Sequence, residues 1–181
     1  IVGIAVSSFL GAFTSFAVYL IGEDSFRITA WMMGYLGGAN WQKIALLLPP
    51  LLFCMAYFYA KRHELNIILN GDEEAKSLGL NVEKSKKSLL IVSSLIIGFS
   101  VAFTGMIGFV GLIIPHTLRM ALHTASNAVL IPASALTGGV FLVFCDVIAK
   151  NALSPVEIPI GVVTSFFGAP FFLYLAFRKH A

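Results

Sequence analysis

One acidic side chain lies well inside an apolar stretch of the sequence. Asp146 belongs to the mostly apolar residues 127–149, and Lys150 follows it by four positions. A carboxylate at membrane depth is a candidate functional group, because such groups are costly to place in lipid. Residues four apart share one face of a helix, so Asp146 and Lys150 are expected to pair. The alternative is a proton-coupling role, for which His116 is the second candidate.

The most polar stretch is NGDEEAKSLGLNVEKSKK, residues 70–87. Asp72, Glu73 and Glu74 would favour a helix start, where the macrodipole stabilises negative charge. Gly79 can end that helix in the left-handed conformation. We expect two short helices separated by Gly79 that form a compact knob. By itself the pattern is also typical of a solvated loop that only fixes the topology.

Enzymatic chemistry has little support in these residues. No P-loop pattern occurs, so the chain is not expected to bind ATP. The two cysteines, Cys54 and Cys145, lie in apolar runs without metal-ligand spacing and are expected to act as small apolar residues. The four histidines and five methionines are scattered. We therefore predict no catalytic residue, no metal site and no bound cofactor.

The composition favours a membrane protein. Apolar residues make up 58% of the chain and charged residues 12%, against roughly 25% charge in soluble domains. A membrane-spanning helix needs about 20 mostly apolar residues. Five stretches satisfy or approach this length, namely residues 1–21, 44–60, 88–104, 127–149 and 158–177. The first is interpreted as a span and not a signal peptide.

A broken stretch, GMIGFVGLIIPHTLR (105–119), follows the third span. Irregular backbone at membrane depth is tolerated only against protein or a water-filled cavity. We expect a fold-back followed by a half-helix over residues 112–122, with Pro115 in its first turn. The three glycines, Gly105, Gly108 and Gly111, indicate close packing, a hinge or both. His116 could cap the half-helix or carry a proton, and Arg119 is expected to reach the membrane interface.

The distribution of positive charge predicts the orientation. Cytoplasmic loops concentrate Lys and Arg, and the segment 61–87 carries half of the chain's 12 such residues: Lys61, Arg62, Lys76, Lys84, Lys86 and Lys87. The C-terminus adds Arg178 and Lys179, whereas the other side has Arg27, Lys43 and Lys150. We expect the 61–87 loop and the C-terminus to be cytoplasmic and residues 22–43 to lie outside.

Several motifs together resemble one known family. Residues 105–119 are similar to a signature of the FecCD-type ABC importer permeases for iron-siderophores, haem and vitamin B12. Further matches follow the family's order at WMMGYLGGANW (31–41), GDEEAKSLGLNV (71–82), LIPASALTGGVFLVFCDVIAK (130–150) and PVEIPIGVVTSFFGAPFFLYL (155–175). The resemblance covers nearly all 181 residues.

The resemblance implies an all-α integral membrane protein: a polytopic bundle of five full spans plus a re-entrant half-helix. Residues 1–181 would form one transmembrane permease domain, with 61–87 as its cytoplasmic coupling loop. They correspond to helices five to ten of a ten-helix subunit. Because the sequence opens at Ile1 without a methionine, we expect an excerpt or fragment that lacks the N-terminal helices.

The family also implies roles for individual residues. Its matching loop docks on the ATPase subunit, which assigns coupling to Glu73, Glu74, Ala75, Leu78 and Gly79. Asn70-Gly71-Asp72 departs from the usual Leu-Gly there, so the helix start stays open by a residue or two. Lys150, often arginine in the family, is expected to dock the binding protein together with Glu157, which lies between two prolines. The family lines its pathway with helix five, which assigns that role to Ser7, Ser8, Thr14 and Ser15.

The expected function is the permease subunit of a binding-protein-dependent ABC importer. It would move a metal chelate, foremost a ferric siderophore, inward by ATP-driven alternating access. The implied partners are a second permease subunit (homo- or heterodimer), two cytoplasmic ATPase subunits holding ATP and Mg, an extracellular or periplasmic substrate-binding protein and membrane lipid, but no nucleic acid. The implied location is the bacterial cytoplasmic (inner) membrane. The alternatives are a proton-coupled secondary transporter using Asp146 and His116, and a membrane scaffold without transport.

Overall fold

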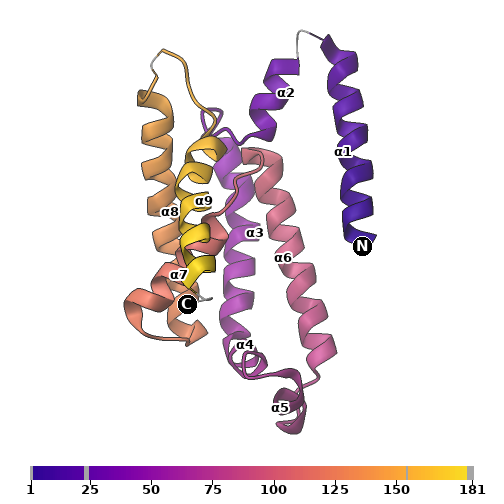
Figure 1. Ribbon diagram of the computed structural model, residues 1–181. Helices are drawn as coiled ribbons and strands as arrows, with labels where there is room; N and C mark the ends of the chain where they lie inside the picture. The colour runs from indigo at the N-terminus through magenta and orange to yellow at the C-terminus, as the bar shows by residue number, and fades with distance from the viewer. Residues whose placement is uncertain (1, 23–24, 154, 179–181) are drawn as a thin grey trace.

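The computed structural model describes residues 2–22, 25–153 and 155–178 (Figure 1). Within these residues the chain forms nine helices and no strand. In chain order they are α1 (Val2–Ile21), α2 (Ser25–Met32), α3 (Trp41–Ala60), α4 (Arg62–Ile68), α5 (Asp72–Ser77), α6 (Val82–Thr104), α7 (Val110–Leu122), α8 (Asn127–Asn151) and α9 (Ile160–Arg178). The predicted all-α class is confirmed. Lys179 lies outside the described residues, and the side chains of Arg27 and Arg178 are not described.

Four helices, α1, α3, α6 and α8, are long and apolar enough to cross a membrane. At most 11% of any of these spans is buried inside the structure, so their apolar side chains face outward, as expected where lipid is the solvent. The expected fifth span corresponds to α9, whose apolar part, Ile160–Leu175, is shorter than the other four. The structure therefore supports a membrane helix bundle, while the count of five full spans stays a prediction.

Two helices begin earlier than the apolar pattern predicted. α3 starts at Trp41 instead of residue 44, and α6 starts at Val82 instead of residue 88. In each case an asparagine caps the first turn: Asn40 accepts from Lys43 N at 2.8 Å, and Asn81 accepts from Lys84 N at 3.1 Å. Side-chain caps stabilise a helix start in polar sequence. Hydropathy located only the apolar part of each helix.

The helices form a bundle with one separate member (Figure 1). α3 packs along α6, and α8 packs against α7 and α9. α4 and α5 lie at one end of the bundle, and α2 with the loops around residues 33–40 and 155–159 lies at the other. α1 stands apart from the bundle in both views, packs against α2 and contains no buried residue.

The buried core is small and lies between α8 and α9. Cys145, Ala149, Ile160 and Val163 form its centre, with Leu36, Ile107, Phe141, Leu142, Ile148 and Ile158 packed around them. Cys54 is buried elsewhere, on α3, and neither cysteine is in a disulfide. The prediction that both act as small apolar residues is confirmed.

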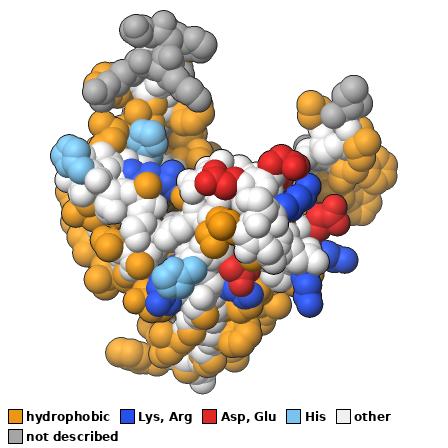
Figure 2. All heavy atoms as spheres, turned by 90° about the horizontal axis from the view of Figure 1, so that it is seen from below, with side chains coloured by type: hydrophobic (Ala, Val, Ile, Leu, Met, Phe, Trp, Pro, Cys, Tyr) orange, Lys and Arg blue, Asp and Glu red, His pale blue; other side chains and the backbone are white. Residues whose placement is uncertain are grey.

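The end with α4 and α5 is the charged end of the molecule. Seen from that side, acidic and basic side chains gather on the face, while apolar side chains cover the flanks (Figure 2). The start of α8 lies at this same end, because Asn127 is hydrogen-bonded to Asn66 on α4. The chain therefore folds back between α6 and α8, as predicted.

Candidate functional site

The coupling segment, which we define as residues 61–87, contains the short helix α5. Asp72, Glu73 and Glu74 occupy its first turn, and Gly71 precedes it with φ of 123°. The predicted acidic helix start is confirmed, and it begins at Asp72, directly after the Asn70-Gly71 pair that departs from the family pattern. Lys76 pairs with Glu73 at 3.1 Å on the exposed surface, a contact of little energetic weight.

Gly79 ends α5 with a Schellman motif. Its φ is 81°, its N–H donates to Lys76 O at 2.9 Å, and the N–H of Leu80 donates to Ala75 O at 3.0 Å. Both bonds satisfy carbonyls at the helix end. Ala75 is fully buried beneath the turn, and Leu78 at its tip is 64% exposed. The predicted left-handed helix end is confirmed, and Leu78 is left free for a partner.

The expectation that Gly79 separates two short helices is wrong. The two short helices are α4 and α5, and residues 69–71 lie between them. After Gly79 the chain enters the long helix α6 directly, because Asn81 caps its first turn. The knob is therefore closed by α6 and not by another short helix.

A carboxylate that the sequence did not single out fastens α4 to the start of α6. Glu64 accepts hydrogen bonds from Lys61 Nζ and from Ser85 Oγ, the latter at 2.8 Å. The bond to Lys61 lowers the pKa of Glu64 below its ordinary 4.5 and raises the pKa of Lys61 above its ordinary 10.5. Both groups therefore stay charged at neutral pH. Lys86 adds an ion pair to Asp72 at 2.6 Å.

A second unpredicted contact joins α4 to α8. The Oδ1 of Asn66 accepts from the backbone N–H of Asn127 at 2.9 Å and from its Nδ2 at 2.8 Å. An asparagine beside a polar helix start could have been suspected as a cap. Its partner 61 positions away could not.

The break after α6 differs in detail from the prediction. Gly105 ends α6 with φ of 68°, and Phe109 precedes α7 in the left-handed conformation, with φ of 65°. α7 begins at Val110 and not at residue 112, so Pro115 lies inside the helix and beyond its first turn. The left-handed turn at Phe109 sets this earlier start.

The earlier start of α7 changes where His116 and Arg119 lie within the helix. His116 lies in mid-helix, exposed, with its ring 6.2 Å edge-on from that of Phe171, so the interpretation as a helix cap is wrong. Arg119 is exposed near the end of α7 that faces the charged end of the molecule.

A Cβ added at Gly108 or Gly111 would meet no atom within 4 Å, so close packing applies to Gly105 alone of the three. A hinge role stays a prediction.

Three backbone segments meet at the end opposite α5, and we call this the glycine clasp: residues 33–35, 104–105 and 160–161. Tyr35 N donates to Thr104 O at 2.9 Å, Ile160 N to Gly34 O at 3.1 Å and Gly161 N to Met33 O at 3.0 Å. A Cβ at Gly105 or Gly161 would collide with a backbone carbonyl of residue 31 or 33. Glycine is needed at these positions because the backbone segments approach one another without side chains between them.

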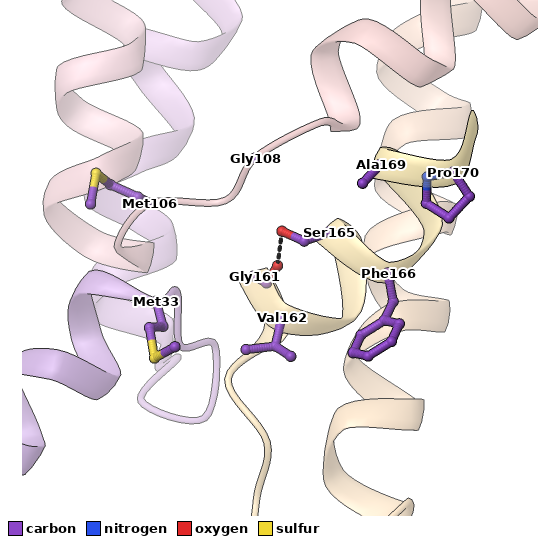
Figure 3. Close-up of a pocket in the computed structure, with 9 residues that line it drawn as sticks. All are labelled: Met33, Met106, Gly108, Gly161, Val162, Ser165, Phe166, Ala169 and Pro170. Atoms are coloured by element: carbon purple, nitrogen blue, oxygen red, sulfur yellow. Dashed lines mark hydrogen bonds between the residues drawn. The ribbon is translucent and has the colours of Figure 1, made fainter. Parts of the chain in front are cut away.

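A cavity of about 570 Å³ opens beside the clasp (Figure 3). It is lined by Met33, Met106, Gly108, Gly161, Val162, Ser165, Phe166, Ala169 and Pro170. The hydroxyl of Ser165 donates to Gly161 O at 2.7 Å and so is turned to its own helix. The wall is apolar. It gives a bulky bound molecule a contact surface without side chains that bind a metal strongly.

The same end carries the charged residues predicted to dock a partner. Lys150 Nζ and Asp146 Oδ2 are 2.6 Å apart, so the expected pairing is confirmed. Glu157 is exposed, and as hydrogen-bond acceptor and nearby negative charge it raises the pKa of Tyr35 above its ordinary 10.0. Tyr35 and Glu157 also line a second cavity of about 780 Å³ between α2 and residues 156–159. Asp146 and His116 are on different helices and have different partners.

The four residues predicted to line a pathway lie on α1. Ser7, Ser8, Thr14 and Ser15 fall within one side of the helix, since residues seven and eight apart return to the same face. Thr14 Oγ1 donates to Leu10 O at 2.8 Å. None of the four lines either cavity described above, so their role stays a prediction.

Among the described residues, no group of three or more His, Cys, Asp or Glu side chains is placed to hold a metal.

Comparison with known proteins finds relatives of this chain among membrane permeases. Residues 1–178 match the sequence profile of the FecCD transport family. The cobalamin import system permease protein BtuC of Halobacterium salinarum is 43% identical over 173 residues, which are 96% of this chain and 46% of that protein. The hemin transport system permease protein HmuU of Yersinia pestis is 37% identical over 182 residues, which are 98% of this chain and 53% of that protein.

A solved structure supports the same relationship. An inward-facing conformation of a metal-chelate type ABC transporter matches with a TM-score of 0.88 and 32% identity, over 97% of this chain and 57% of that one. The chain spans about half the length of the curated relatives it matches.

Proposed function

The chain belongs to the FecCD transport family, and on this premise we propose that it is the coupling half of an ABC importer permease subunit. Such a subunit does not hydrolyse ATP itself. Separate ATPase subunits would bind ATP and Mg, and their closure would push on the coupling segment. Apolar membrane helices and permease relatives support a multi-pass membrane protein.

The geometry of the coupling segment is the observation that carries this proposal. Leu78 is exposed on a turn closed by two backbone hydrogen bonds, and this turn follows α5 at the end of the molecule (Figure 1) whose face gathers the charged side chains (Figure 2). A stiff turn with an exposed apolar tip can bear load, whereas a flexible linker would absorb the displacement. We assign ATPase contact to Leu78 and Gly79, with Glu73, Glu74 and Ala75 forming the helix behind them.

For the cargo we propose a bulky metal chelate or corrinoid. Relatives are named for cobalamin and hemin, and the structural neighbour for metal chelates. The apolar cavity wall supports this class, because thiolate, imidazole or carboxylate ligands would hold the metal and slow its release. The ferric siderophore expected from the sequence is one member of this class and stays a prediction.

The assembly and orientation are part of the same proposal. The charged end with the coupling segment and the C-terminus would face the cytoplasm of a bacterial cell, and the end with Lys150 and Glu157 would meet the substrate-binding protein. A second permease subunit would complete the pathway, with the serines and threonine of α1 on its wall. A proton-coupled transporter is not proposed, since the Asp146 carboxylate is held in an ion pair with Lys150.

Substitution of the exposed leucine tests the proposal. Leu78→Asp in the assembled transporter, reconstituted in vesicles, should abolish ATP-dependent uptake by removing the apolar contact with the ATPase subunit. Leu78→Met keeps size and apolarity and is the matched control. Wild-type uptake by Leu78→Asp, or failure of any ATPase subunit to copurify with the wild-type protein, would contradict the assignment.

A further inference from the structure

The short helix α4 makes polar contacts on two sides. Glu64 accepts from Ser85 near the start of α6, and Asn66 accepts from Asn127 at the start of α8. Two residues along a helix are separated by about 200°, so these contacts leave nearly opposite faces of α4. α4 therefore lies between the starts of α6 and α8. A helix of seven residues is marginal in isolation, so its partners hold it in place.

The contact with α8 is a helix cap supplied from another helix. The first N–H groups of any helix lack partners within it. Ser126, which precedes α8, makes no side-chain cap. Asn66 takes this place by accepting from the N–H of Asn127 and from its side-chain amide. In the part of the chain that the structure describes, no other hydrogen bond or ion pair joins residues 61–87 to α8.

α6 and α8 are thus connected to α5 in different ways. α6 follows α5 directly through the turn at Gly79 and is also held to it by the Asp72–Lys86 ion pair. α8 is reached through α4. The far end of α8 carries the Asp146–Lys150 pair beside the clasp, so α8 runs from the ATPase-facing end to the end proposed to dock the binding protein.

We infer that α4 transmits the displacement of α5 to α8 through the Asn66–Asn127 joint, with Asn66 as its positioning residue. This inference rests on the proposed function and names a part of the mechanism beyond the knob itself. A push on Leu78 moves α5 and, through the short link 69–71, α4. Because Asn66 holds the first residue of α8, that helix moves with α4, and its outer end moves with it.

The test separates uptake from hydrolysis in the assembled, reconstituted transporter, with cobalamin and hemin as probes. Asn66→Leu removes the acceptor at similar size and should lower cargo moved per ATP by about tenfold, a usual coupling strength between sites. ATPase-subunit binding and ATP hydrolysis should persist. Asn66→Asp keeps the acceptor, gains from the helix N-terminus and should restore wild-type transport.

Two outcomes overturn the inference: uptake per ATP unchanged in Asn66→Leu, or uptake and hydrolysis lost in equal proportion in that variant. If Asn66→Leu does not assemble, the pair Asn66→Cys with Asn127→Cys decides. Joining the cysteines with a short bifunctional maleimide should raise uptake per ATP above that of the same double variant without the cross-link. A cross-link that blocks uptake would refute the inference that α4 and the start of α8 move together. The native Cys54 and Cys145 are 2% and 0% exposed, so they are protected from the reagent. Failure of the proposed function looks different, because the wild-type protein would then bind no ATPase subunit.

Discussion

Substitution of Gly79 should loosen the coupling segment in a graded order. Its φ of 81° suits glycine, and no atom lies within 4 Å of an added Cβ. The effect of Gly79→Ala is therefore backbone strain without steric collision, about 1–2 kcal/mol for an L-residue in this conformation. Gly79→Asn should lose less, because asparagine visits the left-handed region readily.

Proline at position 79 should be the most damaging. It holds φ near −65° and has no N–H, so it cannot take the observed turn and deletes the bond to Lys76 O. The second bond of the motif, from Leu80 N to Ala75 O, depends on the same turn. A net loss of about 0.5–1.5 kcal/mol for each bond, added to the strain, places Gly79→Pro well beyond Gly79→Ala.

Hydrogen exchange of α5 measures this order directly. A loss of 1–2 kcal/mol corresponds to roughly a 5- to 30-fold change in an opening equilibrium. Amides bonded within α5, such as those of Ala75 and Leu78, should exchange faster by this factor in Gly79→Ala, and cargo moved per ATP should fall in the same order. Gly98→Ala, in open space on α6 without a positive φ, is the control. Unchanged exchange in both Gly79→Ala and Gly79→Pro would refute the reasoning.

Three further predictions concern other parts of the molecule. Because the folded pKa of Glu64 lies below its ordinary 4.5, its stabilisation is complete above that pH and is lost as the pH falls through the folded value; the protection of α4 amides, measured as exchange relative to the same amides in the unfolded chain, should fall only there, and a loss of protection at neutral pH would contradict this. Lys150→Glu should reduce stimulation of ATP hydrolysis by the binding protein while Lys150→Arg keeps it, and equal stimulation in both would exclude docking at this residue. Gly161→Ala should lower thermal stability by about 1–3 kcal/mol through overpacking, whereas Gly139→Ala, which meets open space, should not; equal melting of the two would argue against the clasp.

The sequence predicted the parts of the fold that depend on local pattern. Apolar length located α1, α3, α6 and α8, and a glycine–proline break located the fold-back before α7. The ends were less accurate, because caps such as Asn40 and Asn81 extend a helix into polar sequence where hydropathy carries no signal. The start of α7 was missed for a similar reason, since it depends on a left-handed phenylalanine, which is uncommon.

The candidate site divides in the same way. The acidic first turn of α5 and the glycine that ends it are decided within ten residues, and both were predicted. The Glu64–Ser85 and Asn66–Asn127 contacts join residues 21 and 61 positions apart, and only the packed bundle brings them together. Close packing was predicted for Gly105, but of the 16 glycines nothing in the sequence indicated that Gly34 and Gly161 would be its partners where three backbone segments touch.

The glycine clasp has a consequence for how this end of the molecule tolerates change. Its hydrogen bonds run from main chain to main chain, so they are indifferent to the side chains that flank them. Residues on the cavity wall, such as Met106 and Phe166, can therefore be exchanged without loss of these main-chain bonds, so the architecture that carries them keeps its register. In the importer that we propose, cargo preference and mechanical integrity would thereby be under separate chemical control.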